Sequence, residues 1–373
     1  MNKVLFSGLL VAASFGIMNA QTVHIPDAAF KSKLLTHYPK IDTDNDNEIS
    51  VAEAEAVIDN LSLSDGGIQD LTGLEAFKNI KTLRIEGNSI TSGTLNLQAQ
   101  KDLQQLYAED CSLSSIDISQ NADLEILNCN INQISTLDVS HNPKLRILEC
   151  GENQLTALDL NQNPQLTELM CYYNQISALD LSQNKDLTDI SAYDNQISAL
   201  DISQNTALVR IDLENNQLTT LDASQNANLL KLILKNNQLN SLDISFGDYQ
   251  NFSELDITNN PALSCVKITA GQTPQSTWMK DDSASFNANC GTMGVQNLHT
   301  INETAVFPNP TTDLVKVKST LTPTSIKVYN SAGHLVAQNQ NQQNISLKNL
   351  NRGVYILHIT INGENIIKKV IKK

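Results

Sequence analysis

Leucines and other apolar residues recur through the middle of this chain with a period of 21 residues. One unit runs from Leu145 to Gln165, with Asn153 near its centre and apolar residues at six positions: Leu145, Leu148, Cys150, Leu155, Leu158 and Leu160. The same residue types recur from Leu124, Leu166, Leu187, Leu208 and Leu229, and a looser copy starts at Leu103. One unit cannot bury its own leucines, so we expect neighbouring units to stack into a solenoid with a continuous core.

Each unit begins with a strand-like pattern and continues into a turn. Residues 145–150 alternate inward and outward positions, which predicts a short strand that pairs in parallel with its neighbours. The asparagine that follows carries two donors and an acceptor, and we expect it to bind backbone groups of the turn. It recurs as a column: Asn132, Asn153, Asn174, Asn195, Asn216 and Asn237.

An aspartate recurs in the second half of each unit. The column comprises Asp117, Asp138, Asp159, Asp180, Asp201, Asp222 and Asp243. A ladder of metal sites is one interpretation, but aspartate, serine and asparagine commonly bind local backbone groups and fix turns, which favours a structural role. We therefore predict parallel strands on the concave face of the solenoid, with turns and irregular structure on its convex side.

Irregular copies flank the regular units, and we expect the whole array to span residues 57–263. Ahead of it, residues 1–20 have the pattern of a secretory signal peptide, with Lys3, a short apolar run and a cleavage site after Ala20. Residues 21–56 predict a small helical cap. No later apolar run reaches the ~20 residues that a membrane span needs.

Within the cap, acidic residues follow the spacing of a calcium-binding EF-hand loop. The expected ligands are Asp42, Asp44, Asp46, Glu48, Ser50 and Glu53. Glu48 would use its backbone carbonyl and Glu53 both carboxylate oxygens. Asn47 stands where glycine is usual, although asparagine tolerates the left-handed backbone. One structural calcium ion is the expectation, and a solvated acidic turn is the alternative.

Composition changes towards the C-terminal end. Residues 264–291 predict a cap closed by a Cys265–Cys290 disulfide, residues 292–303 a linker, and residues 304–373 a β-sandwich of short alternating strands. This last stretch has eight lysines and one arginine against two acidic residues, a net charge of +7. Since the whole chain carries −15, the remainder carries −22, and nucleic acid is a poor partner for it.

Four further cysteines lie within the array. Cys129, Cys150 and Cys171 share one inward position in three consecutive units and are expected to pack as small apolar thiols. A strand spacing of about 4.8 Å leaves a disulfide between neighbours open as an alternative. Cys111 takes the asparagine position of an earlier unit.

Two families resemble parts of this chain. The pattern L-x-x-L-x-L/C-x-x-N-x-L resembles bacterial leucine-rich repeats and is similar to that of internalin-like proteins. The tail resembles the C-terminal sorting domain of the type IX secretion system of Bacteroidota. The matching residues are Phe307-Pro308-Asn309-Pro310, Val328-Tyr329-Asn330, Gly333, Leu350, Gly353-Val354-Tyr355 and the basic end from Lys368 to Lys373. This resemblance implies export by the type IX machinery, followed by release or by anchoring at the outer-membrane surface.

Leucine-rich repeats bind through their concave face, where we expect variable residues at outward strand positions. Three tyrosines cluster there in adjacent units with carboxylates around them, and tyrosine is frequent at interface hot spots. The candidate ligand-binding residues are Tyr172, Tyr173, Tyr193, Asp194, Glu149, Glu152, Glu168, Asp189 and Asp212. Aromatic rings with acidic neighbours also suit sugars. The alternative is a set of ordinary solvated positions.

These features favour a secreted or cell-surface protein that binds a protein or glycan on another cell. A structural surface-coat protein without a defined ligand is the alternative, and the regularity of the array favours it. An enzyme is the least expected function. Of the six histidines only His141 lies in the regular units, and the sequence has no phosphate-binding loop or zinc-ligand spacing.

Overall fold

The computed structural model describes residues 21–246, 251–290, 305–319, 322–330, 334–361 and 364–373. The expected signal peptide at residues 1–20 and the expected linker at residues 292–303 lie outside this part of the chain. Two compact units divide the chain, Met1–Cys290 and Gly291–Lys373. Among the residues that the structure describes, no helix has the length and apolar character to span a membrane.

Two short helices form the N-terminal cap, α1 (Ala28–Leu35) and α2 (Val51–Ala56). Asp27 begins α1 by accepting a hydrogen bond from the Phe30 N–H, and its second oxygen accepts bonds from the backbone of residues 69 and 70. Phe30 and Leu34 are fully buried against the first coils. One side chain thus both starts the helix and ties the cap to the array.

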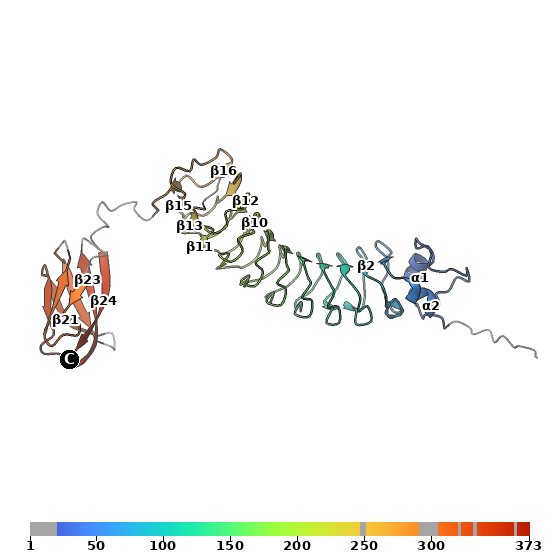
Figure 1. Ribbon diagram of the computed structural model, residues 1–373, viewed down its shortest axis with the longest axis horizontal. Helices are drawn as coiled ribbons and strands as arrows, with labels where there is room; N and C mark the ends of the chain where they lie inside the picture. Colours follow the sequence, from blue (N-terminus) through green and yellow to red (C-terminus); the bar gives the residue numbers. More distant parts are fainter. Residues whose placement is uncertain (1–20, 247–250, 291–304, 320–321, 331–333, 362–363) are drawn as a thin grey trace, which may run out of the picture. The chain divides into compact units, whose positions relative to one another are not determined.

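Eleven parallel strands form the main sheet, one for each coil (Figure 1). They are β1 (Asn60–Ser62), β2 (Thr82–Arg84), β4 (Gln105–Tyr107), β6 (Ile126–Asn128), β7 (Ile147–Glu149), β8 (Glu168–Met170), β9 (Asp189–Ser191), β10 (Arg210–Asp212), β12 (Lys231–Ile233), β14 (Glu254–Asp256) and β16 (Trp278–Met279). Leu148 pairs with Leu127 on one side and Leu169 on the other, so neighbours are in register at 21 residues. The predicted parallel solenoid is confirmed, and Figure 1 shows these strands along the inner side of its curve.

The opposite side of the solenoid is more regular than the predicted turns and irregular structure. It includes the 3-10 helix η1 (Leu74–Ala76) and six short parallel strands in two groups. The strands are β3 (Thr94–Asn96) and β5 (Ser115–Asp117), then β11 (Thr220–Asp222), β13 (Ser241–Ile244), β15 (Cys265–Ile268) and β17 (Ser285–Asn287). β16 and β17 extend the parallel pairing past residue 263, where the array was expected to end. A disulfide joins Cys265 to Cys290 in this last part.

The asparagine column binds the coils together, as its residue type indicated. Asn195 is representative: its Nδ2 donates to the carbonyls of Cys171, Ala192 and Tyr193, and its Oδ1 accepts from the Ile176 N–H. Each such side chain links its own turn to the preceding coil. The aspartate column also makes local bonds, as when Asp180 accepts the Ser182 N–H at 3.0 Å.

A second asparagine column lies on the other side of the core. Its six members are fully buried: Asn121, Asn142, Asn163, Asn184, Asn205 and Asn226. Asn184 donates to the carbonyls of Leu160 and Asn163, one coil earlier, and the other members repeat this pattern. The Oδ1 atoms of all six have no hydrogen-bond partner among the described residues. The donors of this column therefore hold the coils together without help from their acceptors.

The cysteine column consists of buried free thiols. Cys129, Cys150 and Cys171 are fully buried, and burial raises the pKa of Cys129 and Cys171 to about 12. Cys111, in the asparagine position, donates from Sγ to the Ile85 carbonyl at 3.0 Å. The thiol thus replaces part of the asparagine's bonding to the preceding coil.

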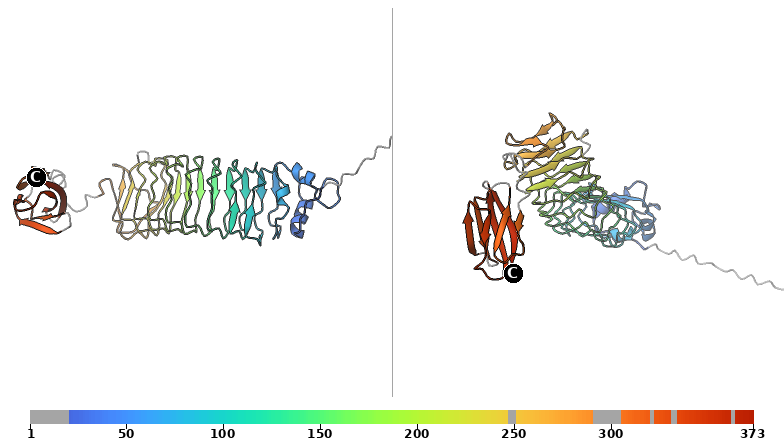
Figure 2. Two further views of the ribbon diagram at one scale, coloured as in Figure 1. Left: turned by 90° about the horizontal axis from the view of Figure 1, so that it is seen from below. Right: turned by 60° about the vertical axis from the view of Figure 1, so that its left-hand side comes forward.

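The second unit contains two antiparallel sheets, consistent with the predicted sandwich (Figure 2). One sheet joins β18 (Ala305–Phe307), β19 (Leu314–Lys318) and β22 (Asn344–Ser346). The other joins β21 (Leu335–Gln340), β20 (Ser325–Tyr329), β23 (Gly353–Ile361) and β24 (Glu364–Lys372). Both sheets contribute to one core, which includes Val315, Val317, Val328, Leu357, Ile359 and Val370.

Replacing one asparagine of the first column should destabilise the solenoid far more than replacing its exposed neighbour. Asn195→Ala leaves buried carbonyls and an N–H group unpaired, and we expect the free energy of unfolding to fall by about 3 kcal/mol. Gln196→Ala, at an exposed position, is the control. Equal denaturant midpoints for the two variants would contradict a bonding role for Asn195.

The cap should lose stability in acid through Glu53. Burial alone would raise the pKa of this carboxyl, but hydrogen bonds from Ser50 and Thr43 outweigh it and lower the pKa from 4.5 to about 2. Since the folded pKa is depressed, this stabilisation is present above pH 4.5 and is lost as the pH falls towards 2. With a calcium chelator present, the Glu53→Gln variant should have a lower Tm than the parent chain at pH 7. Its Tm should also fall less than that of the parent as the pH is lowered from 4.5 towards 2. Glu55→Gln is the control, and matching pH profiles for both variants would refute the assignment.

Candidate functional site

Three tyrosines form a packed cluster beside β8 and β9, and we call Tyr172, Tyr173 and Tyr193 the tyrosine cluster. The rings of Tyr172 and Tyr193 are stacked, with centroids 4.9 Å apart and planes at 2°. Tyr173 meets both rings edge-on, at 6.2 Å and 5.3 Å. The stacking follows from the repeat, because equivalent residues of neighbouring coils lie one strand spacing apart, about 4.8 Å.

Gly151 leaves room for this stack. It takes the position of Tyr172 one coil earlier, and a Cβ built on it would lie 2.7 Å from two carbons of the Tyr172 ring. The Tyr172 ring therefore covers Gly151 on one side and Tyr193 on the other. The sequence analysis did not include Gly151 among the candidate site residues.

Three of the candidate residues occupy the turn after the strands and not the strand face itself. Glu152, Tyr173 and Asp194 all have a positive φ, between 47° and 53°. Our expectation that these three residues lie on outward strand positions is therefore wrong, because the backbone turns away from the strand there. Tyr173 is 51% exposed at this rim. Asn215, one coil after Asp194, donates to it at 3.0 Å.

The carboxylates of the main sheet fall into two groups. Asp189 on β9 pairs with Arg210, and with Asp212 it lines a depression of about 200 Å³ over β8, β9, β10 and β12. Burial raises the pKa of Asp212. Glu149 and Glu168 lie on the other side of the tyrosine cluster, on β7 and β8, and no ion pair of the described residues includes them. Of these four carboxylates, only Asp189 has an ion-pair partner among the described residues.

The tyrosine hydroxyls lie in a negative environment. Burial, followed by the charges of Glu152, Glu109 and Glu149, raises the pKa of Tyr172. Burial and the neighbouring rings, with Asp212 and Glu152, raise the pKa of Tyr193 to about 12. Both hydroxyls therefore keep their protons at physiological pH and can donate to a ligand.

The acidic loop of the cap brings together three of its six expected ligands. Carboxylate oxygens of Asp42, Asp44 and Asp46 all lie within 4.8 Å of one another. The Asp46 N–H lowers the pKa of Asp44, but burial and neighbouring carboxylates outweigh it and leave that pKa raised. Asn47 has φ 63°, the left-handed conformation expected at its position.

The side chains of Glu48 and Glu53 have partners within the protein. Glu48 forms an ion pair with Lys31 at 2.5 Å, but the ligand atom expected from this residue is its backbone carbonyl. Glu53 accepts bonds from Thr43 with one oxygen, and with the other it completes a capping box with Ser50 at the start of α2. Glu53 would have to give up some of these bonds to reach an ion with both oxygens.

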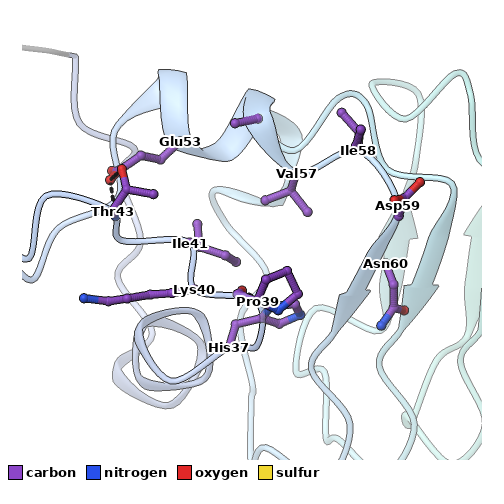
Figure 3. A pocket seen from close by; sticks show the side chains of 11 residues that line it. His37, Pro39, Lys40, Ile41, Thr43, Glu53, Val57, Ile58, Asp59 and Asn60 are labelled. Carbon is purple, nitrogen blue, oxygen red and sulfur yellow. Dashed lines mark hydrogen bonds between the residues drawn. The ribbon is translucent and has the colours of Figure 1, made fainter.

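A pocket that the sequence analysis missed lies between this loop and the first coil (Figure 3). It has a volume of about 240 Å³ and apolar walls that include Ile41, Val57 and Ile58. His37 lines it, with Nε2 accepting the Ser62 N–H at 3.1 Å and Nδ1 3.1 Å from the Pro39 carbonyl. These contacts fix the tautomer of the ring and give His37 a structural role. No sequence motif marked this pocket.

Comparison with protein families finds one match, which covers the tail. Residues 305–373 match the family described as the secretion system C-terminal sorting domain. A comparison with curated proteins finds no match.

Comparison with solved structures finds bacterial repeat proteins. The functional domain of internalin J from Listeria monocytogenes, which includes a cysteine ladder, is 20% identical with a TM-score of 0.40, over 94% of this chain and 98% of that one. A leucine-rich-repeat protein from Leptospira interrogans is 20% identical with a TM-score of 0.48, over 64% and 62%. Internalin F from Listeria monocytogenes is 17% identical with a TM-score of 0.33, over 70% and 96%.

The sorting domain supports secretion and attachment at the cell surface. The 21-residue period and the parallel coils give residues of the first compact unit a leucine-rich-repeat fold, and residues 305–373 match the secretion system C-terminal sorting domain.

Proposed function

We propose that this protein is a secreted or surface-anchored binding protein that contacts a protein or glycan on another cell through the tyrosine cluster. The observation that carries the proposal is the stacked pair of Tyr172 and Tyr193, held over Gly151 at the edge of the concave sheet. Gly151 in the neighbouring coil gives the Tyr172 ring the room that this stack uses. Export by the type IX machinery would bring this face to the cell surface.

The cluster would bind with little loss of conformational freedom. Each ring packs against the other two, so its rotamer is fixed before a ligand arrives. The backbone beneath is fixed by the asparagine columns on both sides of the core. Tyrosine combines a large apolar ring with a hydroxyl donor, which is why it is frequent among residues that dominate binding energy.

Removing the tyrosine cluster should abolish capture of a surface ligand. The full chain and its Tyr172→Ala/Tyr173→Ala/Tyr193→Ala variant would serve as baits for surface extracts and for a glycan array. We expect capture by the parent chain only, because a binding site of this size depends on a few anchoring side chains. Tyr38→Ala is the matched control, since it removes a 93% exposed tyrosine from the cap.

Gly151→Ala offers a second way to disturb the cluster. The added Cβ would meet the Tyr172 ring and displace it, so we expect weaker capture without loss of any tyrosine. If the parent chain and the triple tyrosine variant capture the ligand equally well, the tyrosine cluster on the concave face is not the binding site. If no bait captures a ligand, the result favours a structural coat protein.

We also propose that the acidic loop binds one calcium ion that locks the cap. The clustered oxygens of Asp42, Asp44 and Asp46 support this, and carboxylates are ligands that calcium prefers. Calorimetry should detect one site, and calcium should raise the Tm of the cap by mass action. Asp44→Asn should remove both effects, whereas Asp102→Asn, at an exposed turn, should not. No heat and no shift in Tm for the parent chain would exclude calcium.

A further inference from the structure

Cations on the concave face are already paired with carboxylates. From β2 to β14, each basic side chain on an outward strand position, or two residues after a strand, forms an ion pair. The pairs are Arg84–Glu86, Arg210–Asp189, Lys231–Glu254 and Lys235–Glu214. These pairs neutralise the two ends of the face and leave its middle acidic.

Four carboxylates in that middle form no ion pair among the described residues, although Arg146, whose carbonyl accepts the Glu168 N–H, directly precedes β7. Glu109, Glu149, Glu152 and Glu168, which we call the acidic row, take part in none of the ion pairs found among the described residues. Glu109 and Glu149 each accept a bond from an asparagine amide, at 3.2 Å and 3.3 Å. An amide orients a carboxylate but leaves its charge in place.

The acidic row acts on the tyrosine cluster as one negative field. Burial, then Glu109 and Glu168, raises the pKa of Glu149, so Glu149 lies within electrostatic reach of a carboxylate on each side of it. The pKa of Tyr172 is raised partly by three members of the row. An anionic ligand would be repelled here, and a cation would relieve the repulsion.

The Tyr172 ring next to the row does not offer an open stacking platform. Tyr172 has Tyr193 against one face and Gly151 beneath the other, and Tyr173 packs edge-on to the pair. A sugar that stacks needs a free ring face, whereas a cationic side chain needs carboxylates and hydroxyl oxygens. The covered faces of Tyr172 therefore favour recognition of charge and hydrogen bonding.

The length of the row indicates more than one cation. Glu109 follows β4, and Glu168 lies on β8, which is three strand pairings further along the sheet order β4-β6-β7-β8. At about 4.8 Å for each pairing the row spans roughly 14 Å. A single small cation would neutralise only part of this length, but an extended peptide could place several basic side chains along it.

We propose that the acidic row and the tyrosine cluster bind a basic segment of a partner protein, with lysine or arginine side chains lying among Glu109, Glu149 and Glu168. This inference rests on the proposed function and names the chemistry of its ligand. Charge complementarity of this kind raises the rate of association and selects against anionic partners.

A labelled tetra-arginine peptide tests the inference on the full chain, with fluorescence anisotropy at low and moderate salt. The test variant is Glu149→Gln/Glu168→Gln, which removes two charges from the row. Asp102→Asn/Asp186→Asn removes the same charge from exposed turns ahead of β4 and β9. We expect the test variant to bind roughly threefold to tenfold more weakly, the control to bind as the parent does, and binding to weaken with salt.

The outcomes separate this inference from the proposed function. Equal weakening by the control variant, or no binding of the peptide by the parent at low salt, would overturn the basic partner. A surface ligand whose capture requires the tyrosine cluster could still be captured by the test variant at high salt. In that case the proposed function stands and the ligand is not basic. If the triple tyrosine variant captures surface ligands as well as the parent chain does, the proposed function itself fails.

Discussion

Every coil of this solenoid depends on its neighbours for both its apolar core and its polar backbone. The leucines of one coil are covered by equivalents above and below, and the strands of the solenoid are only two to four residues long. Asparagine side chains on both sides of the core carry the coupling, because their amides donate to carbonyls of the preceding coil. Stability is therefore shared along the array, and a 21-residue register is the condition for it.

The same register creates the candidate site. A residue repeated in adjacent coils comes within about 4.8 Å of its equivalent, which is a stacking distance for two aromatic rings. Tyr172 and Tyr193 use this coincidence, and Gly151 gives the first ring a place to lie. The period also determines which charged side chains can pair. Unlike charges at equivalent positions of adjacent coils form ion pairs, as in Arg210–Asp189, whereas the acidic row forms none among the described residues. Structure and recognition thus follow from one geometric constraint.

Much of the fold could be predicted from the sequence, because periodicity reports which residues face inward. The parallel strands, the first asparagine column and the inward cysteines follow from it. Periodicity does not show the sign of the backbone φ angle, so the left-handed turn at Glu152, Tyr173 and Asp194 was not predicted. A spacing motif likewise does not show competing partners. Glu53 matches a calcium-loop position, yet its oxygens accept bonds from Ser50 and Thr43.

The details of the site were less predictable than the fold. Sequence placed the tyrosines in adjacent coils, but the face-to-face stack depends on an absent Cβ in a third coil. The separation of paired from unpaired carboxylates depends on which side chains meet across the sheet. The pocket beside His37 lies where the cap meets the first coil, and no periodic signal crosses that junction.

Site-specific photo-cross-linking tests most directly whether the concave face is the contact surface. A photoreactive residue would replace Ser191, which lines the depression beside the tyrosine cluster, or Ala199, on the opposite side of the same coil. A concave binding site predicts cross-linked partner from position 191 and only background from position 199. Equal yields from both positions, or a yield from position 199 alone, would contradict it.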